Sequence, residues 1–383
     1  MFRGISLRTT TVALLLGWGG MLYAGDDAPA TVTGTVTDTD GKVISGAIVT
    51  AFDSKRESSV SVFTQSDGRF VIKGATAGTD RVRARLIGRL DNEIELDSLG
   101  SAEGVKLVME TAGADERKMQ MRGVDRLDLL KFDDEKDALN FKMMCAYCHQ
   151  VGTEGFRTPE EPIDWQVMLT RMDGFGGLYK HTQKNIVDKI VKIYGPGAEQ
   201  TWPEFQPPAA PSGETLDAVI YEWDMGTQDK CMIHDLEPGN DGLIYVVDMA
   251  NDCVRTLNPR TAERSVYAIP GGKEPDSDEH SVLGPHSIEP TENGDMWLTL
   301  AHSGQMARFV PGSQEFTLFS GAPKPARRGR YPHSLRTDQM GIVWYTDAGT
   351  NSVFSIDPAS ADVKEYKLLK AGQARGAGRG ESR

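Results

Sequence analysis

The sequence predicts a multidomain, mainly β protein that combines a β-sandwich, a small all-α domain and an incomplete β-propeller. Three observations predict this class. Short β-like runs fill residues 29–111, helical periodicity replaces them over 133–197, and a repeated four-strand unit fills 215–371. The length of 383 residues leaves room for two or three domains.

The composition excludes one class of partner. Lys and Arg number 42 against 55 Asp and Glu, which gives a formal net charge of −13. A chain this acidic, with no basic stripe rich in aromatic residues, is not expected to bind nucleic acid. The 41 glycines and the 39% of apolar residues suit a β-rich globular protein better than a helical one.

Residues 1–24 are expected to be a signal peptide. Arg3 and Arg8 precede a short apolar run over 11–22, and Ala24 supplies a small residue at the cleavage point. The apolar run is shorter than the roughly 20 residues that span a membrane; an uncleaved anchor is the alternative. We therefore expect a periplasmic or secreted protein with no membrane span after signal cleavage.

The first β-rich segment alternates between strand and turn signals. Asp40-Gly41 and Asp67-Gly68 are typical turn pairs between runs with a period of two. The expected strands are 31–37, 47–52, 69–72 and 105–109.

The segment 29–111 resembles the carboxypeptidase regulatory-like domain, a small transthyretin-like β-sandwich. Because the segment has no histidine, no cysteine and no clustered carboxylates, it is expected to be a scaffold or binding module. Asp38 and Asp67 are read as turn residues, with calcium ligation as the alternative. The resemblance rests on Gly34-x-Val36-x-Asp38, Gly46-Ala47 and Thr64-x-x-Asp67-Gly68-x-Phe70-x-Ile72.

Residues 112–132 are polar and are expected to be a linker. Helical periodicity follows, with Asp133 or Asp134 as the cap of a helix that runs to Met144. Further helices are expected at 163–172 and 182–194.

The pair Cys145 and Cys148, followed directly by His149, forms the attachment motif for c-type haem. Each cysteine can add across one vinyl group of the porphyrin, and His149 is then the expected proximal ligand of the haem iron. A redox dithiol or half of a zinc site is the alternative, but the only other cysteines, Cys231 and Cys253, are widely spaced. We expect one covalent haem c. Cys231 and Cys253 are left free to form a disulfide or to stay reduced.

The stretch from Cys145 to Tyr194 resembles small monohaem cytochrome c domains, whose haem motif is followed by Trp-x-x-x-x-x-Arg-Met and a closing helix. Trp165, Arg171 and Met172 stand at those places, so the resemblance implies that Met172 is the distal iron ligand. The glycine-rich run 173–177 would help the backbone to place it. The alternatives are Met168 and His181. Iron with His and Met ligands has no vacant position for a substrate, so electron transfer is the expected role.

A proline-rich linker is expected over 198–214, and an internal repeat follows it. Four short strands in each unit of roughly 40–50 residues predict propeller blades. Each unit starts at a histidine, namely His234, His286 and His333, with an aromatic residue eleven positions later at Tyr245, Trp297 and Trp344, and with Asp248, Leu300 and Asp347 fourteen positions later.

The repeated region resembles the streptogramin (virginiamycin B) lyase family of propellers, whose blades carry Pro-His-x-Ile and then Trp-Phe-Thr-Glu. That family opens a macrocyclic lactone by elimination, with a histidine base, an acidic residue and a metal ion. The candidate catalytic residues are therefore His234 with Asp248 and His333 with Asp347, expected together near the mouth of the channel. They are either base-and-orienter pairs, a metal site, or ties between neighbouring blades.

The chain has three repeats, fewer than the roughly 4–8 blades of a closed propeller. Residues 218–223 are interpreted as the outer strand of a further blade. Residues 372–383 are interpreted as a disordered tail. The expectation is a truncated product, or a ring completed by another chain.

The function expected from these parts is that of an exported c-type cytochrome. It would bind haem and exchange electrons with a periplasmic redox partner protein, while the propeller and the sandwich act as recognition or docking modules. A small-molecule substrate at the propeller is a further expectation. The alternative is a lyase-like propeller enzyme, a C–O lyase, with an accessory haem.

Overall fold

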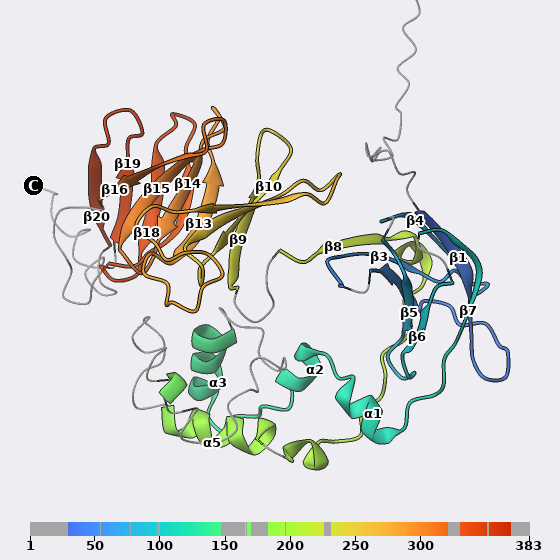
Figure 1. The fold of residues 1–383 in the computed structure, drawn as a ribbon. Coiled ribbons are helices and arrows are strands. Elements are labelled where there is room, and N and C mark those ends of the chain that lie inside the picture. The colour runs from blue at the N-terminus through green and yellow to red at the C-terminus, as the bar shows by residue number, and fades with distance from the viewer. Residues whose placement is uncertain are drawn as a thin grey trace, which may run out of the picture.

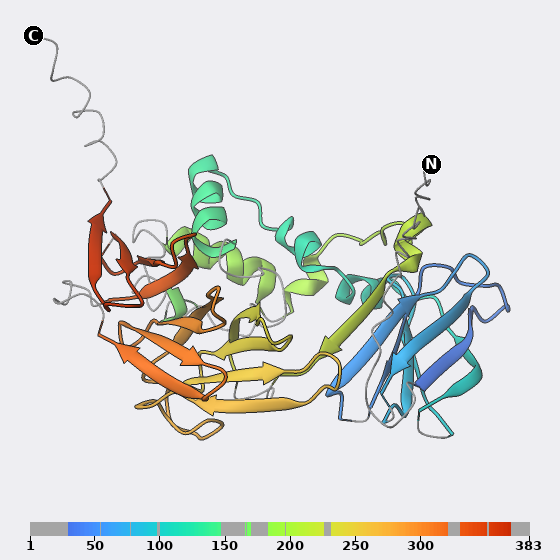
Figure 2. The same cartoon turned by 90° about the horizontal axis from the view of Figure 1, so that it is seen from above.

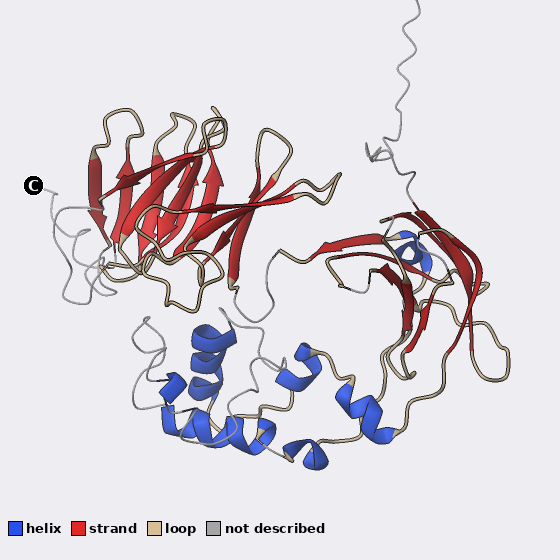
Figure 3. Ribbon diagram, in the orientation of Figure 1, coloured by secondary structure: helices blue, strands red, loops and turns tan. Residues whose placement is uncertain are grey.

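The computed structural model describes residues 30–146, 165, 167–169, 183–225, 231–320 and 330–368, except 54, 77, 98, 99, 196 and 351. The described chain forms a β-rich N-terminal body, a group of helices, and three four-stranded sheets (Figure 1, Figure 3). Figure 2 shows the N-terminal body and the three sheets at opposite ends of the molecule. No helix in the described part of the chain is long and apolar enough to cross a membrane.

The N-terminal body consists of two sheets around one apolar core. Alternation along the strands turns Phe70 and Ile72 inward, against Val32 and Leu107, and leaves the residues between them toward solvent. The first sheet has the order β4 (Arg69–Ala75), β1 (Ala30–Thr37) and β7 (Ala102–Val108), with β1 and β7 parallel. The second has the order β6 (Asn92–Glu95), β5 (Arg81–Arg85), β2 (Ile48–Phe52), β3 (Ser58–Phe63) and β8 (Val219–Trp223).

Strand β8 corrects the expectation for residues 218–223. It does not belong to a blade, but pairs antiparallel with β3, with Val60 opposite Tyr221. Strand β3 would otherwise be an open edge, and Tyr221 adds apolar surface to the sandwich core. The sandwich is therefore completed by residues more than a hundred positions beyond its last contiguous strand, β7.

The helices form a second apolar core. Asp134 caps α3 (Glu135–Phe141) by accepting a hydrogen bond from the Lys136 amide at 2.7 Å, while Asp133 pairs instead with Lys189. The stretch 112–132, expected as a linker, carries two short helices. The remaining elements are α1 (Ala114–Met119), α2 (Gly123–Leu127), the π-helical turn Lys142–Ala146, α5 (Gln183–Tyr194) and the 3₁₀ turns Ala198–Thr201 and Gly213–Asp217.

Three antiparallel sheets follow in chain order, as the repeat predicts. Each contains four consecutive strands, and the first strands β9, β13 and β17 lie next to one another. Apolar side chains such as Tyr245, Phe309 and Phe354 fill the spaces between the sheets. The strands are β9 (Ile233–Pro238), β10 (Ile244–Asp248), β11 (Cys253–Leu257), β12 (Arg264–Ala268), β13 (Pro285–Pro290), β14 (Met296–Leu300), β15 (Gln305–Val310), β16 (Glu315–Phe319), β17 (Pro332–Thr337), β18 (Val343–Asp347), β19 (Ser352–Ile356) and β20 (Val363–Lys367).

Arg264 connects the first blade to the sandwich. Arg264 of β12 donates to the carbonyl oxygen of Asp224 at 2.7 Å and to that of Glu57 at 2.5 Å. Asp224 itself donates its amide to Glu57, at the start of β3. The end of β8, the start of β3 and the outer strand of the first blade thus meet at one point.

Removing the Tyr221 side chain tests whether β8 belongs to the sandwich. We expect Tyr221→Ala to lower the free energy of unfolding by about 1–2 kcal/mol, because it uncovers part of the sandwich core. Chemical denaturation measures the change. Glu222→Ala, on the opposite face of β8, is the matched control; equal effects of the two variants would contradict the assignment.

Candidate functional site

Cys145 lies in the helical core at the end of α3. It occupies the π-helical turn Lys142–Ala146 and is buried, in one apolar cluster with Phe141, Trp165 and Leu169. Single-turn π-helices are rare and are frequently found at functional sites. The other residues of the expected haem site, Cys148, His149, Met172 and the alternative His181, lie outside the described residues.

Large apolar side chains are exposed close to Cys145 in the sequence. Leu139 and Met143, six and two residues before it, are 58% and 56% exposed. Val167 and Met168, beside the buried Trp165, are 64% and 39% exposed. The helical part therefore buries Cys145 while leaving apolar surface on the same two helical segments uncovered.

The histidines of the three blades gather in one row. The ring centroids of His234 and His286 are 3.7 Å apart, and those of His286 and His333 are 4.1 Å apart. The His234 Nδ1 atom is 2.7 Å from the carbonyl oxygen of His286. Sequence reasoning named His234 and His333 as candidates, and the structure adds His286 between them.

His286 is the central and most deeply buried ring of this row. Burial lowers its pKa to about 3, and the neighbouring rings of His234 and His333 act in the same direction. Its Nδ1 atom has no hydrogen-bond partner within the described chain. The pKa of His333 is also lowered, first by burial and then by His234. His286 and His333 are therefore held in the neutral form at neutral pH.

Each histidine is separated from the aspartate of its own blade, so the predicted His–Asp pairs do not form. Ile233, not His234, lies opposite Asp248, and Pro332, not His333, lies opposite Asp347. In both strand pairs the register shifts at this point, and the resulting β-bulge leaves the histidine without a residue directly opposite it. No hydrogen bond joins the two in either blade over the described ranges.

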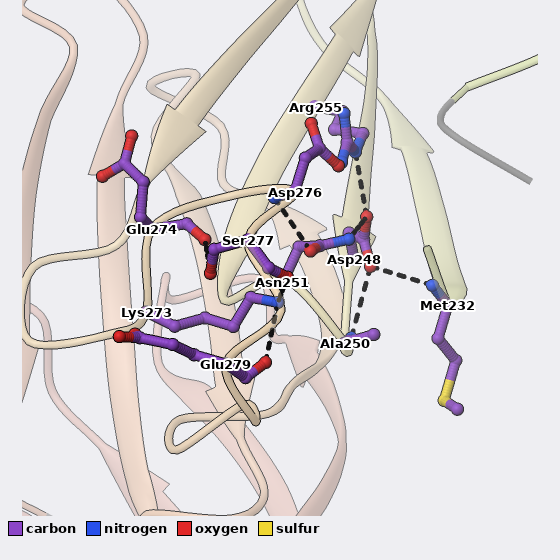
Figure 4. Close-up of polar contacts among 10 residues, drawn as sticks. All are labelled: Met232, Asp248, Ala250, Asn251, Arg255, Lys273, Glu274, Asp276, Ser277 and Glu279. Carbon is purple, nitrogen blue, oxygen red and sulfur yellow. Dashed lines mark hydrogen bonds and ion pairs between the residues drawn. The ribbon is translucent and has the colours of Figure 1, made fainter. Parts of the chain in front are cut away.

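Asp248 instead holds the end of its blade together (Figure 4). It is fully buried and accepts hydrogen bonds from the amides of Met232 and Ala250 and from the Asn251 side chain. Its Oδ2 atom also accepts from Arg255 Nε at 2.9 Å. Arg255 also donates a hydrogen bond from Nη2 to Asp276 Oδ1 at 2.6 Å, which connects the blade end to the loop after β12.

The same backbone amide is capped in all three blades. Asp248 accepts from the amide of Met232, and Asp347 accepts from the equivalent amide of Tyr331. The middle blade has Leu300 where the others have aspartate, and its equivalent amide, that of Gly284, is bound by Asp252 of the preceding blade at 2.9 Å. The aspartates thus bind a backbone amide at the start of each blade. The middle blade has no aspartate of its own at this place because Asp252 of the preceding blade binds its amide.

Cys231 and Cys253 are free thiols in this structure. Burial raises the pKa of Cys231, and it raises that of Cys253 to about 12. Both thiols therefore remain protonated at neutral pH, which makes them weak nucleophiles. Over the residues that the structure describes, no group of three or more His, Cys, Asp or Glu side chains has an arrangement that could hold a metal ion.

The comparisons with known proteins recognise the N-terminal part. Residues 31–110 match the family model of the carboxypeptidase regulatory-like domain, which confirms that expectation for the sandwich. The search of curated proteins finds no match.

Solved structures that resemble this chain include propeller lyases. A virginiamycin B lyase from Staphylococcus aureus is 21% identical, with 40% of this chain and 47% of that chain covered and a TM-score of 0.33. A streptogramin B lyase is 17% identical, with 41% and 47% covered and a TM-score of 0.33. A nidogen/laminin complex is 18% identical, with 33% and 44% covered and a TM-score of 0.26. The chain spans less than half the length of the lyases it matches.

Removal of the Asp248 carboxylate tests its structural role. Asp248→Ala leaves Arg255 buried without one of its two carboxylate partners, and we expect it to lower the free energy of unfolding by about 3–5 kcal/mol. Chemical denaturation gives the value. Asp362→Ala, an exposed aspartate of the third blade, should change stability by less than about 0.5 kcal/mol. A loss below about 1 kcal/mol for Asp248→Ala would contradict the account.

The histidine row predicts a pH dependence of stability. The pKa of His286 is lower in the folded chain than its ordinary value near 6.5, so the unfolded chain binds more protons between those two pH values. Stability should be constant above about pH 6.5 and fall by about 1 kcal/mol per pH unit as the pH drops toward 4.

Denaturation at pH 7.5, 6.5 and 5.5 measures this slope. His286→Phe should reduce it, whereas the exposed His280→Gln should leave it unchanged. A slope that is identical in the wild type and His286→Phe would show that His286 is not the group responsible.

Proposed function

We propose that the protein is an exported c-type cytochrome that transfers electrons. One haem c is bound through thioether bonds to Cys145 and Cys148, with His149 and Met172 as the iron ligands. The observation that carries the proposal is the motif Cys145-x-x-Cys148-His149, which begins in the apolar core of a helical segment. The signal-like residues 1–24 support export, since haem c is attached outside the cytoplasm.

The described residues around Cys145 fit such a group. A haem has a large apolar surface, and the described surroundings of Cys145 are apolar, with Phe141, Trp165 and Leu169 in the same cluster. The buried position of Cys145 suits a bond to the haem edge inside the core. When bound, haem iron with His and Met ligands supplies reversible one-electron chemistry.

The chain's own residues would then set the conditions for electron exchange. Trp165, Leu169 and the α5 residues Ile186 and Ile190 are buried and form a dry wall beside the Cys145 segment. A dry, apolar surrounding and a thioether ligand both favour the reduced, less charged iron. The partner is a redox protein of the periplasm, and the sandwich and blades act as recognition or docking modules.

The lyase alternative has less support. It needs a histidine base beside an acidic residue, and in the described chain neither His234 nor His333 is hydrogen-bonded to the aspartate of its blade. The histidine row is instead involved in contacts between blades, as the bond between His234 and the His286 carbonyl illustrates.

Covalent attachment is tested by expression with a cytochrome c maturation system. We expect the wild type to retain its haem through denaturing electrophoresis, because thioether bonds survive unfolding. The double variant Cys145→Ala/Cys148→Ala should lose the haem, and Cys231→Ala should keep it. Haem that can be extracted from the wild type, or that stays on the double variant, would refute the proposal.

The distal ligand is tested by two methionine variants. Met172→Ala should open a coordination position, so that carbon monoxide binds the ferrous iron and the reduction potential falls. Met168→Ala, whose side chain is 39% exposed, should leave both properties unchanged. Spectroscopic titration with carbon monoxide and redox potentiometry give the answer, and the reverse pattern would assign the ligand to Met168.

A further inference from the structure

A cavity of about 530 Å³ lies between the sandwich and the proline-rich segment. Its volume falls in the range of small-molecule sites, about 300–1,000 Å³. Three stretches of chain line it: the sandwich, the turn between α1 and α2, and the extended segment after α5. The lining residues include Ile48, Phe63, Arg85, Asp91, Ala209 and Pro211.

The walls of this cavity are firmly held. Gln120 accepts a hydrogen bond from the Gly88 amide at 2.7 Å and donates to the Arg89 carbonyl at 2.6 Å, which fixes the helical turn on the sandwich. Gly46 has φ +77°, and a Cβ there would come within 2.5 Å of the Pro211 carbonyl oxygen. The proline segment therefore packs directly on the sandwich, and its stiffness keeps the wall in place.

Arginines from β5 give the cavity a positive side. Arg83 and Arg85 point to one face of the strand, while Val82 and Ala84 are buried on the other. Arg85 lines the cavity, and its guanidinium makes no hydrogen bond or ion pair within the described chain. Arg83 lies two residues earlier on the same face of β5. Its buried Nε atom has no hydrogen-bond partner among the described residues.

The acidic groups nearby do not balance these charges. Glu93 is already bound by Arg56 at 3.2 Å and Arg81 at 3.4 Å. Asp91 is the one carboxylate of the described lining, and burial raises its pKa despite Arg83 and Arg85. Burial lowers the pKa of Arg83, and Arg85 and Arg56 repel its charge. An additional anion would be favourable here.

We propose that this cavity binds an organic carboxylate with an apolar body. The carboxylate would pair with the unpartnered guanidinium of Arg85, which suits bidentate binding. The apolar body would pack on Ile48, Phe63 and the prolines of the wall. The site is independent of the haem proposal, because it lies on the sandwich.

Calorimetric titration of the full chain with 2-naphthoate and with its uncharged analogue, 2-naphthamide, tests the site. The acid should bind saturably and at least tenfold more tightly than the amide, since charge-assisted hydrogen bonds contribute about 1.5–3 kcal/mol. Arg85→Gln should remove this difference. Arg69→Gln, an exposed arginine of β4 that does not line the cavity, is the matched control.

A second variant tests the location. Ala209→Trp should fill the cavity and abolish binding of the acid, while the unfolding midpoint reports that the chain is still folded. N-acetylphenylalanine in place of 2-naphthoate distinguishes a peptide C-terminus from a free aromatic acid as the source of the carboxylate. Equal binding of acid and amide, an unchanged affinity in Arg85→Gln, or no saturable binding at millimolar concentration would each overturn the proposal.

Discussion

The pairing of β8 with β3 is the constraint on which the arrangement of the chain depends. The sandwich is completed only after the chain has passed through the helices and returned, so the helical part is held at both ends by one β-rich body. The same return places the proline segment against Gly46 and creates the cavity beside Arg85. It also brings Asp224 and Glu57 to Arg264, which attaches the first blade. One edge strand thus positions all three parts.

Local patterns predicted much of this fold. The alternation over 31–37 and the turn at Asp67-Gly68 identify strands whose residues are near neighbours, and the repeat of His234, His286 and His333 predicts the four-stranded units. The place of β8 was not predictable in this way. Its sequence fits any sheet edge, and the choice of β3 depends on the burial of Tyr221 in a core formed by distant residues.

The propeller residues show the same limit at the scale of single side chains. Spacing correctly placed each histidine on a first strand and each aspartate at the end of a second strand. It could not reveal the register shift, which places Ile233 and Pro332, rather than the histidines, opposite the aspartates. Nor could it show that Asp252 replaces the missing aspartate of the middle blade, because that contact crosses from one blade to the next. The repeated residues form a repeated backbone cap, made by the aspartates, and a row of tilted histidine rings in contact.

The proposed electron-transfer function depends on the chemistry of Cys145, Cys148 and His149 rather than on strand patterns or repeats. Its most direct test is the absorption spectrum of the protein in alkaline pyridine under reducing conditions, together with an iron determination. Thioether bonds saturate both vinyl groups and shorten the conjugation of the porphyrin. The account predicts one iron per chain and bands at shorter wavelength than those of protohaem. A preparation matured under the same conditions that holds no iron, or whose spectrum is that of protohaem, would contradict it.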